Sequence, residues 1–312
     1  MKKNEHMKTL KIFKIATLFL AFTSIIACNA NKRESKKPTS DSIQMAKDTI
    51  PFVLKHLDVD KKKIMPYVTC SEQMVDSLLV IADTVYSHTD HYKLEDLDME
   101  NKDYNEQLEG YYGDTIPTVA ALFDSYARIT NSGMDEADAS FVWHEVARMQ
   151  MKHFFERSGN KWQETKDCEI IFRIIDGMVG SYSFGNQPEI NVAAWRAVMP
   201  IDYRLVDAYK RLADLCNDKE IVKLIHDDYM YMLNVYKEHR DGIEGHYSDL
   251  PRVEGELFKW VLKTKLESIN TLIKRYKRGQ MGLNAVKQNL REHLFIAELN
   301  KEFLDRKGDD FQ

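Results

Sequence analysis

The chain of 312 residues carries 44 basic and 49 acidic side chains, so its formal net charge is −5 at pH 7. This length is sufficient for one large domain or two small ones. An acidic chain argues against a nucleic-acid partner, because binding to nucleic acid depends on the neutralisation of phosphates by lysine and arginine.

Residues 1–27 have the pattern of a secretory signal peptide. The opening is basic and contains the lysines Lys2, Lys3, Lys8, Lys11 and Lys14. It is followed by an uncharged, mostly apolar run, Ile15 to Ala27. This run is shorter than the about 20 apolar residues that a membrane-spanning helix needs. We therefore expect residues 1–27 to be removed, which takes away five lysines and one glutamate and leaves a net charge of −9.

The end of this segment, Ile25-Ile26-Ala27-Cys28, resembles the lipobox of bacterial lipoproteins. The resemblance implies that Cys28 is acylated and becomes the new N-terminus. Two alternatives are an ordinary signal peptide with an unmodified Cys28 and a short anchor that is retained. No later stretch of the sequence approaches the length of a membrane span.

Residues 28–40 are expected to form the lipidated cysteine and a flexible tether, since the stretch is polar and contains Pro38. The signal resembles those of Bacteroidetes lipoproteins, in which acidic residues soon after the cysteine accompany export to the cell surface. Here the stretch is basic, and Asn29 stands where an aspartate would imply retention at the inner membrane. The resemblance therefore implies a cell-envelope protein, anchored in the outer membrane and facing the periplasm.

From residue 41 to residue 312, apolar residues recur at spacings of three and four, which predicts one all-α domain. Thr69 and Glu72 have the spacing of a capping box and predict the start of a first helix. Thr115 and Pro117 predict the start of a second. Further helices are predicted at about 135–157, before Gly159, and at 164–183, 188–199, 201–216, 218–240, 251–278 and 283–305.

An ungapped offset of 83 residues aligns several residue pairs of the second and third helices with later ones. Examples are Pro117 with Pro200, Tyr126 with Tyr209, Asp135 with Asp218 and Gly159 with Gly242. The alignment predicts a multi-helix bundle of antiparallel helical hairpins with an internal repeat. Coincidence is the alternative explanation.

Two histidine-containing stretches are candidates for metal chemistry. His144-Glu145 begins like a zinc-protease motif, but Arg148 stands where the second histidine is required. We therefore expect His144, Glu145, Arg148 and Lys152 to form a charged, solvated helix side. His88 and His91 would share one side of a helix if the first helix continues that far, yet the preceding turn supplies no evident third ligand. The alternative is a polar helix end that leads into the acidic segment 95–114.

The remaining candidates point to structure more than to chemistry. Cys70, Cys168 and Cys216 allow one disulfide of undetermined pairing, or are simply small buried residues. Four basic residues, Lys274, Arg275, Lys277 and Arg278, match the negative end of a helix dipole, with a contact to headgroups or an acidic partner as the alternative. The sequence thus predicts no catalytic residue, no metal and no cofactor, and its one predicted modification is lipidation of Cys28.

One stretch resembles the helical hairpin domain of LprI-type lysozyme inhibitors. The resemblance covers about forty residues and is carried by Leu205, Tyr209, Leu224, Tyr236 and Arg240-Asp241. The chain lacks the family's flanking cysteines and the tryptophan of its second helix. The resemblance implies lysozyme as a partner. We expect a lipid-anchored protein that binds an envelope protein or a cell-wall component, with a hydrolase built from dispersed carboxylates as the alternative.

Overall fold

The computed structural model describes residues 53–97, 110, 112–182, 187–243 and 250–292. The chain divides into two units between Phe52 and Val53. The first unit, which contains the predicted signal peptide, Cys28 and the tether, lies outside the described residues, as does most of the acidic segment 95–114. In the described ranges every regular element is a helix, which confirms the all-α class.

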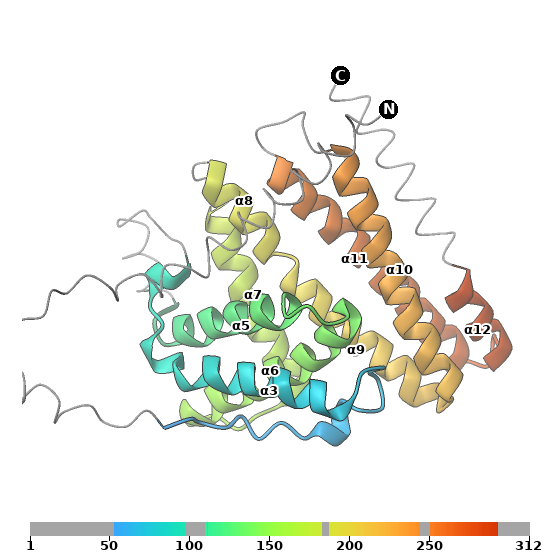
Figure 1. The fold of residues 1–312 in the computed structure, drawn as a ribbon, viewed down its shortest axis with the longest axis horizontal. Helices are drawn as coiled ribbons and strands as arrows, with labels where there is room; N and C mark the ends of the chain where they lie inside the picture. The colour runs from blue at the N-terminus through green and yellow to red at the C-terminus, as the bar shows by residue number, and fades with distance from the viewer. Residues whose placement is uncertain (1–52, 98–109, 111, 183–186, 244–249, 293–312) are drawn as a thin grey trace, which may run out of the picture. The chain divides into compact units, whose positions relative to one another are not determined.

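The helices follow the predicted order closely (Figure 1). The α-helices are α3 (Glu72–Ser87), α5 (Ile116–Thr130), α6 (Glu136–Arg157), α7 (Glu164–Tyr182), α8 (Gln187–Arg196), α9 (Met199–Cys216), α10 (Lys219–Ile243), α11 (Leu250–Lys277) and α12 (Leu283–Arg291). Four short 3₁₀ helices are η1 (Lys61–Lys63), η2 (Thr89–His91), η3 (Leu94–Leu97) and η4 (Gly113–Thr115). The last predicted helix is shorter than expected, since α12 ends at Arg291 and residues 293–312 lie outside the described part.

Helix α6 is the centre of the second unit. It packs against α3, α5, α7, α9 and α10, and each residue from Ala137 to Met151 is buried. A helix buried on all sides needs no amphipathic stripe. Its apolar side chains serve two cores: Trp143 packs with α3, α5 and α7, whereas Phe141 packs with α9, α10 and α11.

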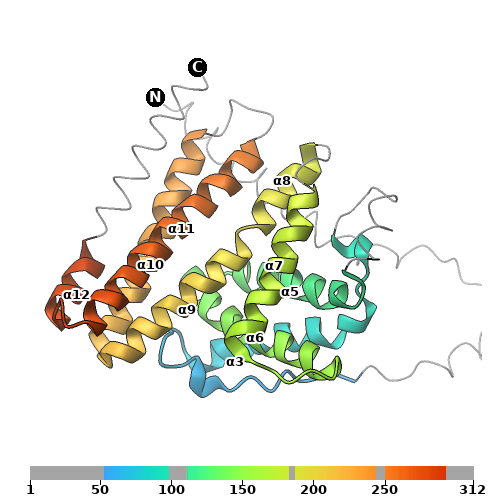
Figure 2. The same cartoon turned by 180° about the vertical axis from the view of Figure 1, so that it is seen from behind.

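The second core lies among α9, α10, α11 and α12, which Figures 1 and 2 show on one side of α6. Helix α11 runs beside both α8 and α9. Gly255 makes this approach possible, because a Cβ atom at that position would lie 3.0 Å from the backbone carbon and from the Cβ of Ala194. The close contact of α8 with α11 thus depends on a residue without a side chain.

The segment before α3 is bound to the helices by its backbone. The Leu57 amide donates to Asp83 Oδ1 at 2.9 Å, and the Leu57 side chain is fully buried. The predicted capping box is wrong in detail: Ser71, not Thr69, caps α3, its hydroxyl accepting from the Met74 amide. Thr69 instead binds a carboxylate on α6, and this tertiary contact outweighs the local one.

The predicted repeat agrees with the helix starts but not with the packing. Helices α5 and α9 start 83 residues apart, as do α6 and α10. However, α5 packs mainly against α6, whereas α9 packs mainly against α11. Helix α10 also continues past Gly242, which therefore does not end it as Gly159 ends α6. The arrangement as repeated hairpins stays a prediction.

Candidate functional site

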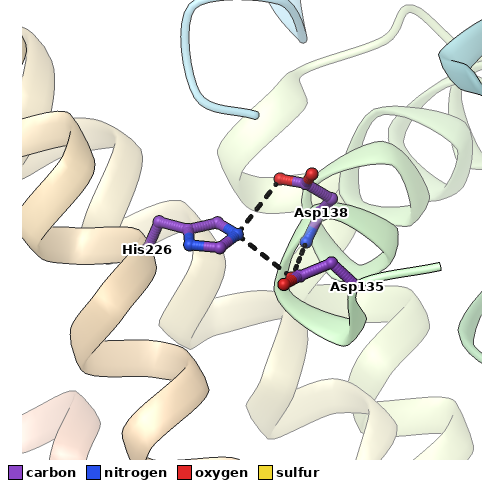
Figure 3. A group of neighbouring side chains, drawn as sticks. All are labelled: Asp135, Asp138 and His226. Atoms are coloured by element: carbon purple, nitrogen blue, oxygen red, sulfur yellow. Dashed lines mark hydrogen bonds and ion pairs between the residues drawn. The ribbon is translucent and has the colours of Figure 1, made fainter. Parts of the chain in front are cut away.

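A histidine and two aspartates meet where the start of α6 faces α10 (Figure 3). His226 Nε2 lies 3.0 Å from Asp135 Oδ1 and 3.3 Å from Asp138 Oδ1. Asp135 is the N-cap of α6, and its Oδ1 also accepts from the amides of Ala137 and Asp138. We call Asp135, Asp138 and His226 the histidine–aspartate cluster.

Asp138 is bonded through both carboxylate oxygens. Oδ1 accepts from the Thr69 amide at 2.9 Å, in addition to its contact with His226. Oδ2 accepts from the Cys70 amide at 2.9 Å and from the Thr69 hydroxyl at 3.1 Å. The side chain is 1% exposed. Asp138 therefore joins the segment before α3 to α6 and, through His226, to α10.

Within the cluster, the charged forms of His226 and Asp138 stabilise each other. Burial opposes protonation of His226, but the hydrogen bonds and charges of Asp138 and Asp135 raise its pKa above the ordinary value. Burial likewise opposes ionisation of Asp138, yet His226 and the Thr69 amide lower its pKa. Burial and the neighbouring Asp138 raise the pKa of the Cys70 thiol to about 11, so Cys70 is not a reactive thiolate at neutral pH.

The ligand atoms of this cluster lie within 4.8 Å of one another, which is close enough to surround a metal ion. A metal requires a neutral imidazole, whereas the raised pKa of His226 favours the charged form. The oxygens of Asp138 already accept from Thr69 and Cys70. The residues present therefore fit a buried ion pair better than a metal centre.

The expectation of a solvated helix side holds in part for Lys152, whose side chain is 35% exposed, but is wrong for His144, Glu145 and Arg148. Their side chains are 5%, 5% and 9% exposed, because α6 is surrounded by other helices. Glu145 accepts from Arg148 Nε at 2.8 Å and pairs with Lys210 on α9. Burial raises the pKa of Glu145, but His144 and Lys210 lower it overall. His144 stacks on the Tyr203 ring at 4.2 Å, and burial lowers its pKa.

A second buried network joins α6, α9 and α10. The hydroxyl of Tyr229 donates to Asp202, and the Ser140 hydroxyl lies 3.3 Å from Asp202 Oδ2. Burial raises the pKa of Asp202 to about 6, against the hydrogen bonds of Tyr229 and Ser140. Nearby, Asp228 accepts from Lys265 Nζ at 2.5 Å and from the Tyr209 hydroxyl at 2.9 Å.

The other predicted residues are placed as follows. Helix α3 ends at Ser87, so His88 caps it and His91 lies in η2, with ring centroids 6.3 Å apart. The two rings are therefore neighbours, but they do not lie on a continuation of α3. In the described part of the chain, Cys70, Cys168 and Cys216 form no disulfide with one another. Lys274, Arg275 and Lys277 lie in the last turn of α11, as the helix-dipole explanation predicts.

A groove among α7, α8, α9 and α11 has a volume of about 490 Å³. Three small side chains, those of Ala193, Ala194 and Ala197, line it and are themselves buried. Val179, Gly180, Ile190 and Ile201 also line it, together with six charged residues: Arg204, Arg252, Lys259, Lys263, Asp176 and Glu256. No pattern in the sequence predicts this groove, because its charged residues come from three separate helices.

Comparison of the chain with protein-family models, with curated proteins and with solved structures gives no match. None of the helices in the described part of the chain is both long enough and apolar enough to cross a membrane.

Proposed function

We propose that the chain is a lipid-anchored protein of the cell envelope that acts by binding a protein or a cell-wall component. The lipobox-like end at Cys28, the polar tether and the acidic helical body support this proposal. Two or more acyl chains hold a protein stably at a membrane, at about 0.8 kcal/mol per buried methylene. The body is then free to use its surface for a partner on the periplasmic side of the outer membrane.

The observation that carries the binding function is the groove among α7, α8, α9 and α11. It combines small and apolar side chains, which can contact a ligand, with charged groups that can orient one. The buried carboxylates serve the fold instead. Asp138, Glu145 and Asp228 each accept hydrogen bonds from neighbouring side chains or amides.

A hydrolase built from dispersed carboxylates is the alternative function. Asp202 comes nearest to that description, because a carboxyl with a pKa of about 6 suits general acid catalysis. Asp202 is only 1% exposed, however, and its partners Tyr229 and Ser140 are buried with it. A substrate cannot reach this carboxyl without opening the core, so binding is the better-supported function.

The test is a titration of the full-length protein in detergent with lysozyme and with purified peptidoglycan, at low and at high salt. We expect saturable binding to one of the two. If the partner is the basic lysozyme, low salt should strengthen binding, because the mature charge of −9 attracts it. A substrate panel for wall hydrolysis is run in parallel. The proposal fails if neither ligand binds in either salt and a wall substrate is turned over.

A further inference from the structure

Residues 53–61, which we call the strap, lie along α3 and run in the opposite direction (Figures 1 and 2). The Lys55 amide donates to the Ser87 hydroxyl at 2.6 Å, at the end of α3. Lys61 Nζ lies 2.7 Å from Asp76 Oδ1, near its start. The strap therefore begins at the C-terminal end of α3 and leads toward its N-terminal end.

The strap and α3 carry most of the large apolar side chains that are exposed in the described part of the chain. Four of these six side chains lie here, Val53, Leu54, Met74 and Val80, with exposed fractions of 73%, 37%, 45% and 57%. Val80 lies seven residues before Ser87 and so shares the side of α3 on which the strap begins. We call Val53, Leu54 and Val80 the strap patch. Such side chains gain free energy when they leave water.

The surface of α3 next to Val80 is uncharged. Ser77 and Thr84 lie three residues before Val80 and four residues after it, and each hydroxyl donates to the backbone of its own helix, to the Gln73 carbonyl at 3.0 Å and to the Val80 carbonyl at 2.8 Å. A hydroxyl that is already bonded in this way costs less to remove from water. This side of α3 can therefore approach an apolar medium.

The length of the chain that precedes the strap indicates what covers the patch. Residues 29–52 separate the predicted lipidated Cys28 from the strap. A flexible chain of that length has a root-mean-square end-to-end distance of about 27 Å. Helix α11 alone, with 28 residues, is about 42 Å long. A lipid anchor at Cys28 would therefore keep the start of the strap nearer to the bilayer than the far side of the helical unit.

The groove lies on another side of this unit. Helix α3 packs against α5 and α6, whereas α8, which lines the groove, packs against α7 and α11. Figures 1 and 2 show the strap and α8 on opposite sides of the unit. A strap that faces the bilayer would thus leave the groove open to the periplasm.

We propose that the strap patch lies on the surface of the lipid bilayer that holds the anchor, with Val53, Leu54 and Val80 at the boundary between headgroups and acyl chains. This inference rests on the proposed function and adds the orientation of the helical unit. Three side chains are enough for this contact, because the tether keeps the patch at a high local concentration beside the bilayer.

The contact is apolar, because the charged side chains of the strap have partners within the protein. Asp90 pairs with both Lys55 and Arg157, and Lys61 pairs with Asp76. Salt screens attraction between exposed charges but not the burial of apolar surface. The patch should therefore stay on the bilayer at high salt.

The experiment uses the full-length protein, purified from membranes and reconstituted in vesicles of phosphatidylethanolamine and phosphatidylglycerol. A photoreactive phenylalanine analogue replaces Leu54, Ile170 or Tyr231, whose exposed fractions match at 37%, 38% and 38%. We expect lipid adducts, detected by mass spectrometry, to form mainly at position 54. Equal adducts at the three positions, in protein that floats with the vesicles, would overturn the inference and leave the proposed function standing. Protein that does not float would overturn both.

A probe in place of Val80 distinguishes contact from mere nearness to the anchor. We expect this probe to form lipid adducts at low and at high salt. Introducing Val53→Asn with Leu54→Asn should reduce them by about fivefold or more, because the altered strap loses less water-exposed apolar surface on the bilayer. The matched control, Ile170→Asn with Tyr231→Asn, changes exposed apolar side chains on α7 and α10 and should leave the adducts unchanged. Equal effects of the two pairs, or adducts that high salt abolishes, would overturn the inference.

Discussion

Asp202 and His226 make the stability of the fold depend on pH, and for both residues stability is lost as the pH rises. For Asp202, the pKa of about 6 in the fold exceeds the ordinary 3.8. Its stability contribution is therefore fully present below 3.8 and declines as the pH rises through about 6. For His226, the pKa is raised above 6.5, so the ion pair contributes fully below 6.5 and declines as the pH passes the raised value.

The first prediction concerns Asp202→Asn. Above pH 6 the folded protein must hold a buried carboxylate, which costs about 3 kcal/mol because burial raises the pKa of Asp202 from 3.8 to about 6. The substitution should therefore be more favourable at pH 8 than at pH 5: relative to the native protein, the variant's free energy of unfolding should be higher at pH 8. Urea denaturation at both pH values measures this. Asp207→Asn, at an exposed position on the same helix, is the control, and an equal pH dependence of both variants would contradict the argument.

The second prediction concerns His226→Gln. At pH 6 the substitution removes the charged partner of Asp138 and should cost about 1–3 kcal/mol of unfolding free energy. At pH 8.5 the cost should be smaller, because His226 loses its charge as the pH rises through its raised pKa. Thermal melts at both pH values test this, with the exposed His56→Gln as the control. A melting temperature of the native protein that rises with added zinc and falls with a chelator would instead favour a metal site.

Helix α6 shows why some elements are easier to predict from sequence than their surroundings. Its bounds follow from local chemistry: Asp135 caps its start, and Gly159, at φ +73°, lies just past its end. Its environment does not follow. The spacing of Glu145 and Arg148 is that of a solvated ion pair, and only the packing of five other helices around α6 makes it a buried one.

The third prediction concerns the contact of α8 with α11. Glycine to alanine in an open helix position stabilises by about 1 kcal/mol. Gly255→Ala should do the opposite and destabilise by about 1 kcal/mol or more, because the new Cβ would press on the backbone of Ala194. Gly180→Ala is the control, since its Cβ would meet nothing within 4 Å. Chemical denaturation should show opposite signs, and stabilisation by both substitutions would refute the proposed close approach.

In the part of the chain that the structure describes, the helices were predictable and the sites were not. Helical periodicity and end signals are local, so the sequence predicts the all-α class and most helix bounds. The histidine–aspartate cluster joins residues separated by 91 positions, and Asp-x-x-Asp at 135–138 is no more than a helix-start pattern when read alone. The groove likewise needs three helices to bring its charges together. Such sites form only when distant helices pack together, and the periodicity of the sequence does not specify which helices do so.

The last prediction concerns the anchor, on which the proposed function of the whole molecule depends. Cys28→Ser removes the only thiol of the lipobox-like sequence, so fatty-acid labelling should be lost and the protein should leave the membrane fraction or remain unprocessed. Cys216→Ser is the matched control, because this cysteine is free and lies at the end of α9. Metabolic labelling and fractionation of both variants give the answer. Labelling that persists in Cys28→Ser would remove the anchor from the proposal, because no second lipidation site is predicted. Binding would then have to be explained for a protein that reaches its partner by diffusion, without the high local concentration that a tether provides.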